Sequence, residues 1–396
     1  MRVLPVPPPS PASSDARPRR RRALARVLSG AIAALALLGA TAEAAGPALP
    51  PLSGASPTLP ALPLPGPLGG LLGRPRPPAP PRPSRPPPSR CPGVSAPGRA
   101  PYAGAVFPCD FPDPMVLKVG REWYAYATGT GWEAPGHLFP VLRSTDMRHW
   151  SQVGDAFLNP PAWSRGDVWA PSVVRAHGRY FMYYSATRRG DNLHCVAVAT
   201  ASRPVGPFRH RRIISCGDRK GRGYIDAAPL VDRDRRVYLY LSVDVPHTLS
   251  VLRLRRDLIH AAGPHKALLG PTRRWQRGLD NPTLEGPSIV RHGRLYYLFY
   301  SAGSWLTDYR MGYAVAHSAS GPFRDYSSNP ILSSPGLVAP GGGSVAVGPG
   351  RSLWLAFHAW TGGPGYGRAR GQRTLRIAPL HWRGARVTVA VRGGSR

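Results

Sequence analysis

Acidic residues are scarce in this chain. Its 396 residues include 20 aspartates and glutamates against 52 lysines and arginines, which gives a formal net charge of +32. Such a charge suggests nucleic acid as a partner, but the sequence contains no helix-turn-helix, zinc-finger or RNA-binding signature. The excess comes from arginine, which is abundant together with alanine, proline and glycine. We therefore expect no nucleic acid partner. Because acidic residues are few, carboxylates at repeated positions of the sequence are informative about function.

Cysteine is also scarce. The four cysteines are an even number, which suits an exported, oxidised protein, and their spacing resembles no zinc site. We expect disulfides between Cys195 and Cys216 and between Cys91 and Cys109, since each of these pairs closes a short loop. The other two connectivities are the alternatives.

Long apolar runs are missing as well. The stretch "VLSGAIAALALLGATAEAA" is too short and too rich in glycine and alanine to predict a membrane span. It follows the basic "RPRRRR" and ends in small residues, so residues 1–45 are predicted to be a secretory signal peptide with an extended basic n-region. We expect a secreted protein without stable membrane insertion, whose basic surface favours association with the cell wall.

Proline and glycine are concentrated between the signal and the rest of the chain. Residues 46–104 include "RPRPPAPPRPSRPPPSR" and lack any pattern that could pack a core. This composition predicts a disordered linker with extended, polyproline-type segments.

One hairpin pattern occurs five times in the remaining sequence. With Pro114, Pro171, Pro229, Pro287 and Gly343 as the register, the steps are 57, 58, 58 and 56 residues. Each copy has an apolar run, a turn and a second, aromatic-rich run, as expected for two paired strands. The copies are "DPMVLKVGREWYAYATG", "APSVVRAHGRYFMYYSA", "APLVDRDRRVYLYLSV", "GPSIVRHGRLYYLFYSA" and "GGSVAVGPGRSLWLAFHAW".

A weaker pair of apolar runs follows each hairpin, as in "SVLRLRRDL" and "RTLRIAPLHW". Each unit therefore carries about four strands, the content of one propeller blade. The sequence predicts an all-β fold, a monomeric five-bladed β-propeller over residues 105–385, with a C-terminal tail at 386–396. A two-sheet sandwich also has many short strands, but it has no reason to repeat at a fixed period.

Three of the few acidic residues stand where first strands of these repeats begin. Asp113 directly precedes its register proline, and Asp226 and Glu285 lie three and two residues before theirs. The first strands of a propeller line its axis, so these carboxylates should meet at one mouth of the channel, beside Trp169 and the glycines of "PGGGS". Each acid alone is an ordinary turn residue. Together they repel one another, which indicates a role in chemistry or cation binding.

Several segments resemble the blade motifs of glycoside hydrolase family 43. They are "FPDPMV" at 111–116, "WAPSVV" at 169–174, "YIDAAPLVDRDRRVYLYLS" at 224–242, "EGPSIVRHGRLYYLFYS" at 285–301 and "WLAFHAW" at 354–360. The resemblance covers about 105–385 and implies a five-bladed propeller acting on arabinose- and xylose-containing polysaccharides. The segment "PGGGSV" departs from the family pattern, because many relatives carry a histidine there.

The resemblance also implies roles for individual residues. Asp113 would be the general base, Glu285 the general acid, and Asp226 a third carboxylate that tunes the pKa of the acid. His358 would lie in the axial channel and hold a water or a calcium-type ion, although no cofactor is required for the reaction. These roles agree with the chemistry, since glycoside hydrolysis needs one protonated carboxyl and one ionised carboxylate.

Other candidates are expected to contact the sugar. Trp169, and with weaker support Trp132, could stack on a sugar ring, with packing inside a blade as the alternative. Arg373 in "GQRTLRI" could reach a sugar hydroxyl.

The predicted function is a secreted glycosidase that degrades arabinan or xylan, acting on polysaccharides or oligosaccharides. Asp113 and Glu285 enter blades one and four, so one blade of the five separates them. This placement predicts carboxyl groups about 6.5 to 9.5 Å apart, which leaves room for a water and implies inversion. One alternative is a non-catalytic carbohydrate-binding propeller at the cell wall. Another is a propeller glycosidase of other specificity, such as the fructan-cleaving relatives, which begin with Asn-Asp-Pro-Asn instead.

Overall fold

The structure is a computed structural model that describes residues 104–129, 137–218, 221, 223–278, 283–333, 336–366 and 371–391. The predicted signal peptide, nearly all of the predicted linker, Cys91 and Trp132 lie outside the described residues. Among the helices of the described part, none is long and apolar enough to cross a membrane.

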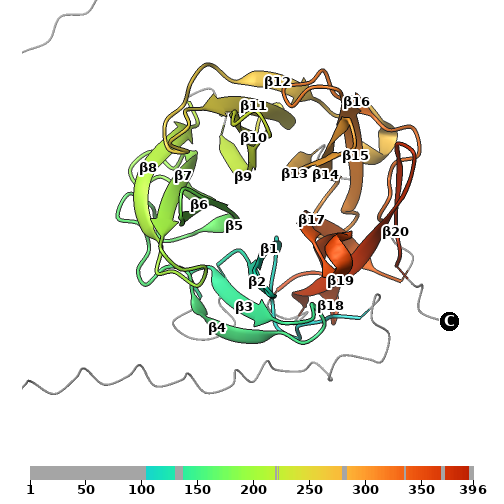
Figure 1. The fold of residues 1–396 in the computed structure, drawn as a ribbon, viewed down its shortest axis with the longest axis horizontal. Coiled ribbons are helices and arrows are strands. Elements are labelled where there is room, and N and C mark those ends of the chain that lie inside the picture. The colour runs from blue at the N-terminus through green and yellow to red at the C-terminus, as the bar shows by residue number, and fades with distance from the viewer. Residues whose placement is uncertain are drawn as a thin grey trace, which may run out of the picture. The chain divides into compact units, whose positions relative to one another are not determined.

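Five antiparallel four-stranded sheets form a ring of blades around a central axis (Figure 1). The fold is the predicted five-bladed β-propeller, and the chain passes through the blades in order. Blade one is β1 (Met115–Val119), β2 (Glu122–Tyr126), β3 (Pro140–Ser144) and β4 (Ser151–Asp155), and blade two is β5 (Trp169–Ala176), β6 (Arg179–Thr187), β7 (His194–Ala201) and β8 (Arg209–Cys216). Blade three is β9 (Tyr224–Val231), β10 (Val237–Val243), β11 (Thr248–Leu254) and β12 (Lys266–Leu269), and blade four is β13 (Leu284–His292), β14 (Leu295–Ala302), β15 (Arg310–Ala316) and β16 (Arg324–Asp325). Blade five is β17 (Val338–Val347), β18 (Leu353–Thr361), β19 (Gln372–Arg383) and β20 (Arg386–Val389), and short 3-10 helices lie at η1 (Arg274–Gln276) and η2 (Pro349–Arg351).

The outer strands differ in detail from the sequence prediction. The segment "RTLRIAPLHW" is part of one long strand, β19, and β20 lies within the predicted tail at 386–396. In blade three, "SVLRLRRDL" supplies only β11, and β12 begins at Lys266. Outer strands are short and half exposed, so their apolar pattern is weaker than that of the inner hairpins.

The hydrophobic core consists of clusters between neighbouring blades. Middle strands show this clearly, because their side chains alternate between the two faces of the blade. On β6, Tyr180, Met182 and Tyr184 pack toward blade one, while Phe181 and Tyr183 pack toward blade three. Each interface is filled by large side chains, and this fixes the angular position of every first strand.

Residues before the first blade close the ring against the last one. The Val106 N–H donates to the Leu375 carbonyl at 2.9 Å, and the Phe111 N–H donates to the Arg373 carbonyl at 2.8 Å. The segment 106–111 thereby extends the sheet of blade five beside β19. This closure holds the start of blade one close to Arg373.

One of the two predicted disulfides lies in the described part. Cys195 and Cys216 are bonded and sit opposite each other on β7 and β8. This pairing is confirmed, and the predicted partner of Cys109 lies outside the described residues.

Candidate active site

A cavity of about 390 Å³ lies where the first strands begin. All five blades contribute to its wall, and the structure brings the three singled-out carboxylates, Asp113, Asp226 and Glu285, to this one cavity. Its volume is in the range of sites that enclose a small ligand. The predicted contact residues Trp169 and Arg373 also line it.

A bulge at the start of each first strand shapes the cavity. In blade four Glu285 pairs with Ser301 and Ser288 with Phe299, so two residues bulge out between the pairs. The first bulged residue has a positive φ, which re-aims the chain at the axis. These residues are Asp113 (52°), Ala170 (44°), Asp226 (54°), Gly286 (60°) and Gly342 (57°).

The bulges correct the register proposed from sequence. In blade three Ile225 pairs with Ser242 and Ala228 with Tyr240, so Ala227, not Pro229, corresponds to Pro287. Asp113 and Asp226 therefore occupy the same position of the repeat, and Glu285 the position before it. The three acids share one cavity without being strictly equivalent.

A ring of five hydrogen bonds ties neighbouring blades together at the bulges. In each case a side chain on the second strand, or directly after it for Thr128, accepts the backbone N–H of the first bulged residue of the next blade, which satisfies that donor. The acceptor and donor residues are Thr128 and Ala170 (2.9 Å), Ser185 and Asp226 (2.9 Å), Ser242 and Gly286 (3.1 Å), Ser301 and Gly342 (2.9 Å), and His358 and Asp113 (3.0 Å). His358 is thus the member of the ring that joins blade five to blade one.

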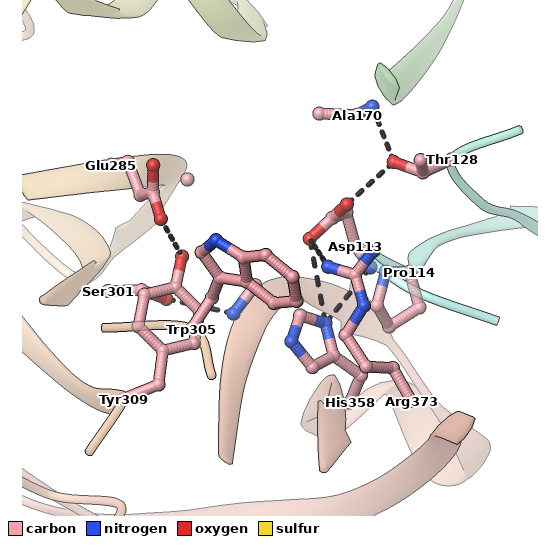
Figure 2. Close-up of polar contacts among 12 residues, drawn as sticks. Asp113, Pro114, Thr128, Ala170, Glu285, Ser301, Trp305, Tyr309, His358 and Arg373 are labelled. Atoms are coloured by element: carbon pink, nitrogen blue, oxygen red, sulfur yellow. Dashed lines mark hydrogen bonds and ion pairs between the residues drawn. The ribbon is translucent and has the colours of Figure 1, made fainter. Parts of the chain in front are cut away.

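Asp113 contacts Thr128, Arg373 and His358, as Figure 2 shows. The Thr128 hydroxyl donates to its Oδ2 at 2.6 Å, and the Arg373 guanidinium lies 3.7 Å from its Oδ1. A Cβ on Gly342 would come within 2.6 Å of the same Oδ1 and 2.4 Å of the His358 ring. The glycine in "PGGGSV" therefore leaves the space that the carboxylate occupies.

Glu285 and Asp226 experience a different environment. The pKa of Glu285 is raised to about 7 as the net result of opposing influences: burial and the charges of Asp113 and Asp244 raise it, while a hydrogen bond from the Tyr309 hydroxyl at 2.7 Å lowers it. Burial, together with the charge of Glu285, also raises the pKa of Asp226 well above its ordinary value. Two such carboxyl groups retain a proton between them at neutral pH.

His358 is fully buried, and burial lowers its pKa to about 3, so the ring is neutral. Because Nδ1 accepts the Asp113 N–H, the single ring hydrogen resides on Nε2, which is buried and has no hydrogen-bond partner among the described residues. An N–H donor suits the oxygen of a water and cannot give a lone pair to a cation. In the described residues no cluster of three His, Cys, Asp or Glu side chains could hold a metal. The residues therefore do not fit a directly coordinated calcium ion at His358.

Aromatic rings and one arginine form the rim. Trp169 meets His194 edge to face, with ring centroids 5.1 Å apart. Trp305 is 42% exposed, stacks on Trp360, and has the Arg373 guanidinium 5.0 Å from its ring centroid. Figure 2 shows Trp305 projecting between Glu285 and Asp113, where a sugar ring could stack.

Sequence reasoning missed four residues of this site: Thr128, Asp244, Trp305 and Tyr309. Thr128 occupies the position of Ser301 in the repeat, so an alignment of the second strands would have revealed it. Trp305 and Tyr309 lie in the loop after β14, outside the repeat. Their aromatic character was the one sequence signal that could have identified them. Asp244 accepts a 2.6 Å hydrogen bond from His194 and carried no sequence signal.

Carboxyl groups in different environments, at the mouth of a five-bladed propeller, match what the cleavage of a glycosidic bond requires. The sequence model of glycosyl hydrolases family 43 matches residues 102–385, and the chain belongs to this family. It is therefore a glycosidase.

Similar proteins include enzymes of several named activities. An extracellular exo-α-(1→5)-L-arabinofuranosidase of Cellvibrio japonicus is 24% identical over 312 residues, covering 69% of this chain and 84% of that protein. An extracellular endo-α-(1→5)-L-arabinanase of Bacillus subtilis is 24% identical and covers 65% of this chain and 80% of that protein. The crystal structure of a thermostable family-43 glycoside hydrolase is 28% identical, with a TM-score of 0.64, over 76% of this chain and 98% of that one.

Proposed function

We propose that this protein is an exported glycosidase that removes or cuts arabinose- or xylose-containing units of plant polysaccharides with inversion at the anomeric carbon. The observation that supports the proposal most strongly is that the carboxyl groups of one cavity have different surroundings. Asp113 lies near a cation and accepts a hydroxyl donor, whereas Glu285 and Asp226 are desolvated together. The names of similar arabinanases and arabinofuranosidases support the choice of sugar.

The proposed acid is Glu285. Asp226 Oδ2 accepts the Gly286 N–H at 2.9 Å and the Ser242 hydroxyl at 3.3 Å, which favour its anion, while within the described part of the chain Glu285 accepts one hydrogen bond, from the Tyr309 hydroxyl. The shared proton is therefore assigned to Glu285, and the Asp226 charge helps to retain it. On glycosidic bond cleavage this proton passes to the departing oxygen.

The proposed base is Asp113. It takes a proton from a water whose oxygen attacks the anomeric carbon as the glycosidic C–O bond breaks. The Thr128 hydroxyl and the Arg373 guanidinium orient this carboxylate and stabilise its charge. Trp169 and Trp305 are proposed to hold the sugar between the two acids, and Arg373 to contact a sugar hydroxyl.

The test is a substrate screen with purified enzyme. Aryl arabinofuranosides, aryl xylosides, linear arabinan and arabinoxylan should include at least one substrate that is hydrolysed. Binding of arabinan or arabinoxylan without turnover of any of them would favour the alternative of a non-catalytic carbohydrate-binding propeller.

Export is part of the proposal. The predicted signal at 1–45 and the extracellular relatives support it. Mass spectrometry of protein from the culture medium should find a new N-terminus near residue 45. Retention of the intact chain inside the cells would argue against export.

A further inference from the structure

A second hollow lies close to the active site on blade four. It has a volume of about 810 Å³, and six of its lining residues carry the inference: Arg273, Arg274, Trp275, Asp308, Arg310 and Asn329. Tyr309, which lines the active-site cavity, lies between Asp308 and Arg310 in the chain. The backbone of this one loop therefore borders both hollows.

The charge of this hollow is opposite to that of the active site. Arg273 is neutralised by Asp325, with Nε and Oδ2 2.6 Å apart. Arg274 and Arg310 form no ion pair with any acidic residue of the described part of the chain. The Asp308 carboxylate already accepts the Ser304 N–H at 2.9 Å within its own turn. Among the described residues, the wall thus carries two guanidinium groups without an ion pair, against the single negative charge of Asp308.

The floor and one wall are held rigidly. Trp275 stacks on Tyr300 with centroids 5.8 Å apart, and a Cβ on Gly312 would come within 2.7 Å of the Trp275 ring, so glycine there allows this close packing. Gln276 donates to the Tyr300 hydroxyl at 2.8 Å. Asn329 accepts the Tyr313 N–H at 3.1 Å. This part of the hollow does not have to become ordered when a ligand binds, which lowers the entropic cost of binding.

We propose that this hollow is a subsite for the carboxylate of a uronic acid residue in the polysaccharide whose neutral sugar is cleaved next to it. A guanidinium group matches a carboxylate with two parallel hydrogen bonds. The anionic active-site cavity, in contrast, suits a neutral sugar, so one substrate chain places its two kinds of residue in the two hollows. The inference rests on the proposed function, since it takes the same polysaccharide as the ligand.

The test compares two forms of one substrate. An arabinose-substituted xylo-oligosaccharide bearing glucuronic acid is assayed beside the same material after its carboxyl is reduced to a neutral hydroxymethyl group. The acidic form should have a kcat/KM about tenfold higher at low salt, as expected for charge-assisted hydrogen bonds. The preference should shrink in 0.5 M sodium chloride, because salt screens exposed charges.

Single arginine substitutions test whether the preference for the acidic substrate arises in this hollow. Arg274→Gln and Arg310→Gln should each reduce the preference severalfold and leave the rate on the reduced substrate unchanged. Arg294→Gln removes one charge from the turn at the opposite end of β13 and should keep the full preference. Equal rates on the two substrate forms, or equal losses on both in the arginine variants, would overturn the subsite.

A binding measurement separates this inference from the proposed function. Calorimetric titration of the protein with the acidic and reduced oligosaccharides, without reliance on turnover, should show tighter binding of the acidic form that Arg274→Gln weakens. If neither substrate is hydrolysed but this difference persists, the proposed reaction is wrong and the subsite stands. If both are hydrolysed and bound alike, the subsite is wrong and the reaction stands.

Discussion

The two walls of the active-site cavity place carboxyl groups in opposite electrostatic environments. On the wall of blades one and five, Asp113 receives a hydroxyl hydrogen bond from Thr128 and faces the Arg373 guanidinium. On the wall of blades three and four, Glu285 and Asp226 are buried together, and burial raises the pKa of each. The first wall stabilises a carboxylate, and the second retains a proton.

The difference shows how a nearly symmetric scaffold produces an asymmetric site. Asp113 and Asp226 occupy the same bulge position, and the same kind of interblade hydrogen bond fixes both backbones. What separates them is the neighbours that the loops and the ring closure bring in. Arg373 reaches Asp113 from β19, next to the closing segment, while Tyr309 and Asp244 surround the other pair.

The largest effect should follow from disabling the first wall. Asp113→Asn removes the proposed base that activates water, so kcat/KM should fall by about 10³-fold or more on every substrate. Natural oligosaccharides and activated aryl glycosides should lose alike, as measured by steady-state kinetics. Retention of the rate on either kind of substrate would remove Asp113 from the role of base.

The effect of removing the proposed acid should instead depend on the leaving group of the substrate. Glu285→Gln should lower kcat/KM by about 10³-fold on a natural linkage and by less than about tenfold on an aryl glycoside whose phenolate departs unprotonated. The two substrates are assayed side by side at one pH. Equal losses on both would mean that Glu285 does not donate the proton.

The second wall should also affect how the free energy of unfolding depends on pH. An unfolded glutamate ionises near pH 4.5, whereas Glu285 in the folded protein keeps its proton to about pH 7, so the folded state binds more protons in this window and loses stability as pH rises through it. Glutamine cannot ionise, so this loss is absent from Glu285→Gln. From pH 4.5 to pH 8, the free energy of unfolding of this variant should therefore rise relative to wild type by up to about 3 kcal/mol. Urea unfolding at both pH values measures the gain.

The same unfolding experiment has a control in Asp113→Asn. This change removes a carboxylate that faces Arg373, so no stability gain at the higher pH is expected from it. If wild type and Glu285→Gln differ by the same unfolding free energy at both pH values, the raised pKa of Glu285 in the folded protein is wrong.

The smallest effect should come from the ring of interblade hydrogen bonds. Thr128→Ala and Ser301→Ala each leave one backbone N–H without its acceptor, and each should cost roughly 1 to 2 kcal/mol in unfolding free energy. Only Thr128 also donates to Asp113, so only Thr128→Ala should lower kcat, by about tenfold. An equal loss of kcat in Ser301→Ala would show that the ring, not the Asp113 contact, controls the rate.

The fold was predictable because its signals are local and repeated. Alternating apolar residues on β6 and β14 serve two interfaces at once, and the same pattern returns in every blade. The register failed only in blade three, where "DAAPL" places a proline two residues beyond the bulge and imitates the position of Pro287. Bulges depend on cross-strand pairing, which the sequence of one strand does not contain.

The acids of the site were predictable, but their partners were not. Asp113, Asp226 and Glu285 stand out because acids are rare and these three enter first strands. Tyr309 and Trp305 come from a loop that follows no repeat. The suggested ion at His358 is not confirmed: its Nδ1 accepts the Asp113 N–H and so joins the last blade to the first, a contact between segments 245 residues apart.

In the proposed mechanism the two walls act on opposite sides of the anomeric carbon, Asp113 through a water and Glu285 on the leaving oxygen. The stereochemistry of the product tests this most directly. Proton NMR of the hydrolysis of an oligosaccharide that the enzyme turns over, recorded in the first minutes before mutarotation, should show the anomer opposite to that of the substrate. Appearance of the retained anomer first, or a glycosyl ester trapped on Asp113, would contradict the account.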